Sequence, residues 1–196
     1  MASWSSIARA SSALSIAGAI LLVYGCRQKQ PLPVYGAVPE FTLMGQDGRP
    51  FDSHALDDKV WVADFFFTSC TGPCPRMSSM MRRIQNDFKG ERGLNFVSFT
   101  VDPARDHPAA LAAYAKRFQA DPDRWHFLTG RVDELNRLSL KVFKLGAVTG
   151  NSLDHSTRFV LVDRRRRIRG FYLTAEPDAL KHLTSDIRSL LDEGAG

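Results

Sequence analysis

The sequence predicts an α/β domain in which helices flank a central mixed sheet. Apolar runs of strand length alternate along the chain with longer segments whose apolar residues recur at the helical period. Such alternation is typical of parallel strands joined by helices. Near the end of the chain, two strand-like runs are separated only by the arginine turn Arg164–Arg167, which predicts an added antiparallel hairpin.

The first half of the domain is expected to supply two strands and two helices. The run Val60–Phe67 is apolar and rich in strand-forming residues, so it predicts a buried strand. A helix is expected over Pro75–Lys89, where apolar residues from Met77 onward return every three or four positions. Leu94–Val101 predicts a second strand, and Pro108–Phe118 a second helix with proline in its first turn.

The second half continues the alternation and closes with the hairpin. Trp125–Leu128 predicts a short strand, and Val132–Phe143 a third helix. The strands Thr157–Asp163 and Ile168–Leu173 form the hairpin, and Pro177–Asp192 is expected to be the last helix.

Two cysteines, Cys70 and Cys74, lie between the first long strand and its helix. The order β-α-β-α-β-α-β-β-α with cysteines at this junction is typical of a thioredoxin-like domain. Thioredoxins place a cis proline in the loop beside the cysteines, but no proline occurs between Pro122 and Pro177 here. A histidine, His155, occupies that neighbourhood instead.

The Cys-x-x-x-Cys spacing is compatible with a disulfide, a peroxide nucleophile or a metal site. Unpaired backbone N–H groups and the positive end of the following helix favour thiolate over thiol at such a junction. Pro73 and Pro75 stiffen the segment around Cys74, which suits a preformed site. Two thiolates and the imidazole of His155 suit Cu(I), and the same set can hold Cu(II).

Four motifs occur in one order: Phe-Phe-Thr-Ser-Cys-Thr-Gly-Pro-Cys-Pro, Phe-Thr-Val-Asp-Pro-Ala-Arg-Asp, Trp-His-Phe-Leu-Thr-Gly and Asp-His-Ser. Together they resemble the SCO/SenC family, from about residue 38 to residue 193. The resemblance implies a membrane-tethered copper metallochaperone that delivers copper to the binuclear copper site of cytochrome c oxidase subunit II. It further implies that Cys70, Cys74 and His155 are the copper ligands. Asp102 would lie near the site or initiate a turn before Pro103.

Other functions use some of the same residues. A thiol–disulfide oxidoreductase would reduce the partner's cysteines through Cys70 and Cys74 without needing His155. A copper or redox sensor would use all three ligands, and another copper chaperone is a further expected partner. A peroxidase is disfavoured, because the Pro-x-x-x-Thr-x-x-Cys run that peroxiredoxins need is missing.

The amino terminus predicts export. The apolar segment 13–25 has the length of a signal-peptide core and ends in Val23-Tyr24-Gly25-Cys26, which resembles a bacterial lipoprotein processing box. Residues 1–26 are therefore expected to be either a signal ending at a lipidated Cys26 or a membrane anchor. Residues 27–37 are expected to form a linker, and residues 38–196 the thioredoxin-like domain. Both readings place that domain outside the bacterial cytoplasmic membrane, facing the periplasm or the cell exterior.

Composition adds one exclusion. The formal net charge is +5, which fits an anionic membrane surface or an acidic partner. The one dense basic run, Arg164–Arg167, has no interleaved aromatic residues, so we expect a solvated turn and no nucleic-acid partner.

Overall fold

The structure is a computed structural model that describes residue 1, residues 31–145 and residues 157–193. The chain divides into two units, residues 1–31 and residues 32–196, and the fold described below is that of the second unit. The expected signal or anchor segment, including Cys26, lies outside the described residues, as does His155. No helix of the described ranges is long and apolar enough to cross a membrane.

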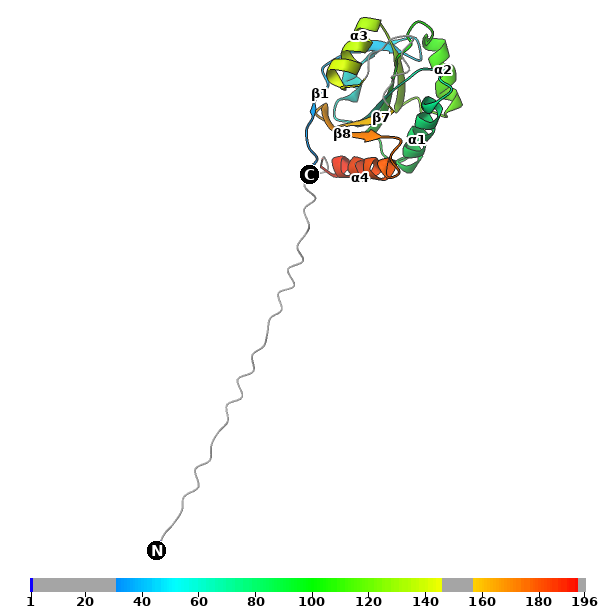
Figure 1. The fold of residues 1–196 in the computed structure, drawn as a ribbon. Coiled ribbons are helices and arrows are strands. Elements are labelled where there is room, and N and C mark those ends of the chain that lie inside the picture. The colour runs from blue at the N-terminus through cyan, green and yellow to red at the C-terminus, as the bar shows by residue number, and fades with distance from the viewer. Residues whose placement is uncertain (2–30, 146–156, 194–196) are drawn as a thin grey trace. The chain divides into compact units, whose positions relative to one another are not determined.

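The described part of the second unit contains one eight-stranded mixed sheet with helices on both faces (Figure 1), which confirms the predicted α/β class. The strand order is β1-β8-β7-β4-β5-β6-β2-β3. The strands are β1 (Gly36–Ala37), β2 (Thr42–Gly45), β3 (Pro50–Asp52), β4 (Val60–Phe66), β5 (Leu94–Thr100), β6 (Trp125–Thr129), β7 (Arg158–Val162) and β8 (Arg167–Leu173). The helices are η1 (Ser53–Leu56), α1 (Pro73–Asp87), α2 (Pro108–Arg117), α3 (Val132–Asn136), η2 (Arg137–Val142) and α4 (Ala179–Asp192).

The sheet has the predicted pairing. Strand β4 pairs in parallel with β5, and β5 with β6, whereas β7 and β8 form the expected antiparallel hairpin. Three short strands before Val60 were not anticipated, because segments of two to four residues carry too little periodicity to be recognised. One of them, β1, lies within the segment 27–37 and pairs with β8.

Two helices differ from their expected form. Helix α1 begins at Pro73 rather than at Pro75, because a proline is well tolerated in the first turn, where its missing N–H has no intrahelical partner. The third helix is divided: α3 ends at Asn136 and continues as the π-helical segment η2.

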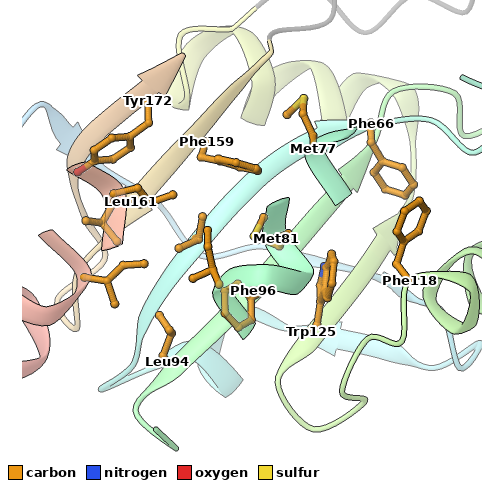
Figure 2. Close-up of a cluster of buried hydrophobic side chains, with 14 of the residues drawn as sticks. Phe66, Met77, Met81, Leu94, Phe96, Phe118, Trp125, Phe159, Leu161 and Tyr172 are labelled. Atoms are coloured by element: carbon orange, nitrogen blue, oxygen red, sulfur yellow. The ribbon is translucent and has the colours of Figure 1, made fainter. Parts of the chain in front are cut away.

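The sheet separates two hydrophobic clusters. One contains buried side chains of α1, α2 and α4, and the other contains those of α3 and η2. Figure 2 shows part of the first cluster, in which Met77 and Met81 of α1 lie among aromatic residues of the strands. Both methionines are therefore core residues, as the helical period predicts.

Candidate metal centre

Cys70 and Cys74 lie where the central strand β4 gives way to α1. The residues between these elements, 67–72, form what we call the thiol loop, and Cys74 follows in the first turn of the helix. Within the described ranges, Cys70 and Cys74 form no disulfide. Cys70 is 8% exposed and Cys74 is 0% exposed, so only Cys70 contacts solvent.

The two thiols interact directly, and Cys74 is held as a thiol. Burial raises the pKa of Cys74 far above its usual value, and a hydrogen bond with Cys70 raises that pKa further. A contact with the Phe67 backbone opposes these effects only in part. Burial thus acts on the pKa of Cys74 in the direction opposite to the helix terminus, because desolvation disfavours the charged thiolate.

The thiol loop is fixed by backbone and side-chain contacts. The Cys70 amide donates to the Phe67 carbonyl at 3.2 Å, which closes a turn. Within that turn, the Thr68 amide and hydroxyl both donate to the carboxyl group of Asp106. Asp106 was missed at the level of sequence, although it is the last acid of the Val-Asp-Pro-Ala-Arg-Asp motif.

Asp102 follows β5 and is 5% exposed. Its carboxylate accepts from Arg105 at 2.8 Å, and its carbonyl accepts from the Arg105 and Asp106 amides. These contacts are those of a turn-initiating aspartate, which is one of its two expected roles. The segment also lies beside the end of β4, because the Val101 amide donates to the Phe66 carbonyl at 2.8 Å.

The chain that carries His155 is described again from Thr157 onward. The Thr157 carbonyl accepts from both the amide and the hydroxyl of Thr174, each at 2.8 Å. The Thr174 carbonyl in turn accepts from Arg76 in the first turns of α1, at 2.7 Å. Thr157 is thus linked through Thr174 to the helix turn that carries Cys74.

The other histidines are not part of this site. His54, His107 and His182 are exposed, and His126 is half-buried beside the Phe51 ring. Among the described residues, no group of three or more His, Cys, Asp or Glu side chains is arranged to hold a metal ion. The described part of the site is therefore the pair of thiols.

A buried acid lies under the thiols. Asp64 is 0% exposed in the middle of β4, and it faces the same side of the sheet as Val62 and Phe66, which belong to the cluster around Cys74. Among the described residues, neither carboxyl oxygen has a well-aligned hydrogen-bond partner. Burial raises the pKa of Asp64 to about 7, and the nearby Ser98 hydroxyl offsets only part of that rise.

The arrangement of the thiols allows two kinds of chemistry. Two adjacent sulfur atoms form a soft donor pair, which suits Cu(I) and, with a third ligand, Cu(II). The same pair can also be oxidised to a disulfide. Whether copper binding or disulfide formation dominates depends on whether a third ligand faces the thiols.

Comparison with known proteins identifies relatives over most of the chain. The SCO1/SenC family model matches residues 30–192. The SCO1 protein homolog of Bacillus subtilis (strain 168) is 33% identical over 162 residues, which cover 80% of this chain and 84% of that protein.

Solved structures give the same result. A SCO1/SenC family lipoprotein from Bacillus anthracis str. Ames has a TM-score of 0.71 and 32% identity, covering 79% of this chain and 95% of that one. BsSco, described as a Sco family cytochrome c oxidase assembly protein with a disulfide switch, has a TM-score of 0.73 and 32% identity, covering 84% and 99%. Yeast Sco1 with copper bound has a TM-score of 0.64 and 25% identity, covering 80% and 90%. These likenesses confirm the predicted thioredoxin-like fold.

Proposed function

This chain belongs to the SCO1/SenC family, and from that membership we propose that it binds copper and helps to assemble cytochrome c oxidase. The observation that carries the proposal is the pair of adjacent free thiols at the junction of β4 and α1. Thiolate sulfur is the donor that Cu(I) prefers, so the donor set fits the metal.

Copper is the cargo in this proposal. Deprotonating the Cys74 thiol is unfavourable in the free protein, and a bound cation would compensate that cost by stabilising the thiolate. The cysteine pair is therefore suited to being a thiol when empty and a thiolate when loaded. Protons would be released on loading, so affinity would rise with pH.

His155 is the proposed third ligand. Two residues of extended chain span at most about 7 Å, so His155 cannot be far from Thr157. The hydrogen-bonded connection from Thr157 through Thr174 to Arg76 links Thr157 itself to the helix turn that carries Cys74. Together with the chemistry of two sulfur donors and one imidazole, this proximity supports a Cys70, Cys74 and His155 site.

The finer proposal concerns the recipient. We propose subunit II of cytochrome c oxidase, with its binuclear copper site, as the protein that receives the copper. Transfer would proceed by exchange of ligands, and Cys70, the thiol that contacts solvent, would be the one that the partner's ligands reach. Asp102, beside the end of β4, is proposed to shape access to the thiols.

The proposed location is the outer side of the cytoplasmic membrane. The relative from Bacillus anthracis str. Ames is described as a lipoprotein. Lipidation of Cys26 in this chain would attach the domain to the membrane, and an uncleaved helix would serve equally.

A dithiol oxidoreductase is the second candidate. The adjacent, unbridged thiols favour it, and BsSco is described as containing a disulfide switch. In this chain the raised pKa of Cys74 opposes a nucleophilic role for that residue, so Cys70 would be the attacking group. This function needs both cysteines but not His155.

Anaerobic titration with Cu(I) against a competing chelator tests the proposal. We expect the reduced chain to bind one equivalent, and His155→Ala to bind it at least about tenfold more weakly, as is usual for loss of one ligand or its support. Cys70→Ser is the matched control that should abolish tight binding. Equal affinity in the wild-type and His155→Ala proteins would refute the ligand set and favour dithiol chemistry.

A further inference from the structure

Asp106 is a buried carboxyl group that none of the proposed roles uses. It lies between β5 and α2 and is 0% exposed. A carboxyl group in the interior is costly unless hydrogen bonds replace its lost water. Among the described residues, no lysine, arginine or histidine forms an ion pair with it, so its partners must be hydrogen-bond donors.

Those donors come from two separate segments. The Thr68 amide donates to Oδ2 at 3.1 Å, and the Thr68 hydroxyl donates to Oδ1. The Thr100 hydroxyl donates to Oδ2 as well. Thr68 and Asp106 are 38 residues apart in sequence. We call this arrangement of Thr68, Thr100 and Asp106 the Asp106 clasp.

One side of the clasp is the thiol loop. Thr68 lies inside the turn that the Phe67 carbonyl and the Cys70 amide close. Asp106 therefore holds the backbone two residues before Cys70 through both a main-chain and a side-chain contact. A turn held at its second residue has little freedom to reorient the thiol at its end.

The other side is the segment that carries Asp102. The Asp102 amide donates to the Thr100 hydroxyl oxygen at 3.0 Å, and the Asp106 amide donates to the Asp102 carbonyl at 2.9 Å. The Thr100 hydroxyl thus accepts from one end of the segment while it donates to Asp106. The result is a closed set of hydrogen bonds from the thiol loop to the Asp102 turn.

We propose that Asp106 is a positioning residue of the dithiol site, which holds the thiol loop against the end of β5 and so keeps Cys70 beside Cys74. The proposal deepens the function proposed above, on which its meaning for copper rests. The positioning effect does not depend on copper, because a fixed turn raises the effective concentration of one thiol at the other. Loss of the clasp therefore weakens every process that needs both sulfur atoms together.

Two substitutions at Asp106 separate position from charge. Asp106→Asn keeps all three contacts, because the amide oxygen accepts from the Thr68 amide and the Thr100 hydroxyl, while the amide nitrogen donates to a rotated Thr68 hydroxyl. Asp106→Ala removes them all. Asp163→Asn is the matched control, since Asp163 is a buried acid that accepts backbone and arginine hydrogen bonds in the β7–β8 turn, near the opposite end of β4.

The first measurement is the equilibrium of the full-length protein in detergent with glutathione. Cys70 and Cys74 give two electrons and two protons to glutathione disulfide, which forms one Cys70–Cys74 disulfide and two glutathione molecules. Mass spectrometry of the peptide that contains both cysteines gives the oxidised fraction. We expect Asp106→Ala to lower the equilibrium constant about tenfold, the effect of losing one to two net hydrogen bonds, and Asp106→Asn and Asp163→Asn to stay within about twofold of wild type.

The second measurement locates the effect. Hydrogen exchange of the same proteins should accelerate in peptides that cover residues 66–72 for Asp106→Ala, and in the β7–β8 turn for Asp163→Asn. If Asp106→Ala fails to fold, Thr68→Val replaces it: this variant keeps the amide contact and should lower the glutathione constant about threefold, in line with one lost hydrogen bond.

Two results would overturn the proposal. One is an unchanged glutathione constant in Asp106→Ala or Thr68→Val, which would leave Asp106 with a role in stability alone. The other is an equal loss in Asp106→Asn and Asp106→Ala, which would assign the effect to charge. Neither measurement uses copper. A wild-type protein that binds no Cu(I) would therefore refute the proposed function, whereas the glutathione and hydrogen-exchange results would still decide the role of the Asp106 clasp.

Discussion

Replacing the buried acid under the thiols, Asp64→Asn, should change how stability depends on pH. Asp64 is fully buried with no well-aligned partner for either oxygen among the described residues, and burial raises its pKa from an ordinary value of 3.8 to about 7. The folded state therefore holds this proton over a pH range in which the unfolded chain has released it. Stability contributed by the group is highest in acid and falls as pH rises through about 7, because unfolding then releases a carboxylate from an unfavourable environment.

The magnitude follows from the two pKa values. At about 1.4 kcal/mol for each tenfold change in an equilibrium constant, full ionisation costs the folded state about 4 kcal/mol. Between pH 5 and pH 8 the change is roughly 2–3 kcal/mol, because part of the difference has already developed at pH 5. Asparagine does not titrate, so Asp64→Asn removes this component. Any cost of burying the amide is the same at both pH values and cancels in the comparison.

The assay is urea denaturation of the reduced, metal-free unit 32–196 at pH 5 and pH 8, followed by tryptophan fluorescence. We expect the stability of Asp64→Asn relative to wild type to rise by roughly 2–3 kcal/mol between the two pH values.

Asp163→Asn is the matched control, with the opposite sign. Although burial alone would raise the pKa of Asp163, hydrogen bonds from Arg167 and Arg169 keep it below its usual value. Its stabilising contribution is therefore present at both pH values and is lost only as pH falls below about 4. A difference between Asp64→Asn and wild type that is equal at pH 5 and pH 8 would show that Asp64 is not held protonated in the fold.

Three further changes test other parts of the structure. Arg169→Ala should destabilise the domain by about 3 kcal/mol in urea denaturation, because Asp163 then loses its fully buried cation; a loss below 1 kcal/mol, roughly that of a surface pair, would contradict this. Met81→Ala should cost about 2–5 kcal/mol by leaving a cavity between α1 and the sheet, and an unchanged denaturation midpoint would show that the core closes around it. Arg76→Ala removes the donor to the Thr174 carbonyl. We expect roughly threefold weaker Cu(I) binding in the wild-type background but no further loss of affinity in the His155→Ala background. An equal loss of affinity in both backgrounds would show that Arg76 acts independently of His155.

Much of the fold was predictable because its signals are local. The runs that form β4 and β5 are rich in apolar and strand-forming residues, and the apolar faces of α1 and α4 repeat at the helical period. The short strands β1–β3 gave no such signal. They are strands because neighbouring strands of the sheet supply hydrogen-bond partners, as β8 does for β1. The sequence predicts the start of α1 at Pro75, two residues late, because either proline suits a first helical turn and Pro73 is the one that fills it.

The sequence by itself determined the chemistry of this protein: two soft donors four residues apart at a strand-to-helix junction, and a family pattern around them. The tertiary structure decided their state. Burial raises the pKa of Cys74 although the thiol lies at a helix terminus, and burial of Asp64 raises its pKa to about 7. Asp106 and Thr68, 38 residues apart, meet only because β4 and β5 pair side by side. Residue type and spacing are local properties of the chain, whereas desolvation and long-range hydrogen bonds exist only after the strands have assembled.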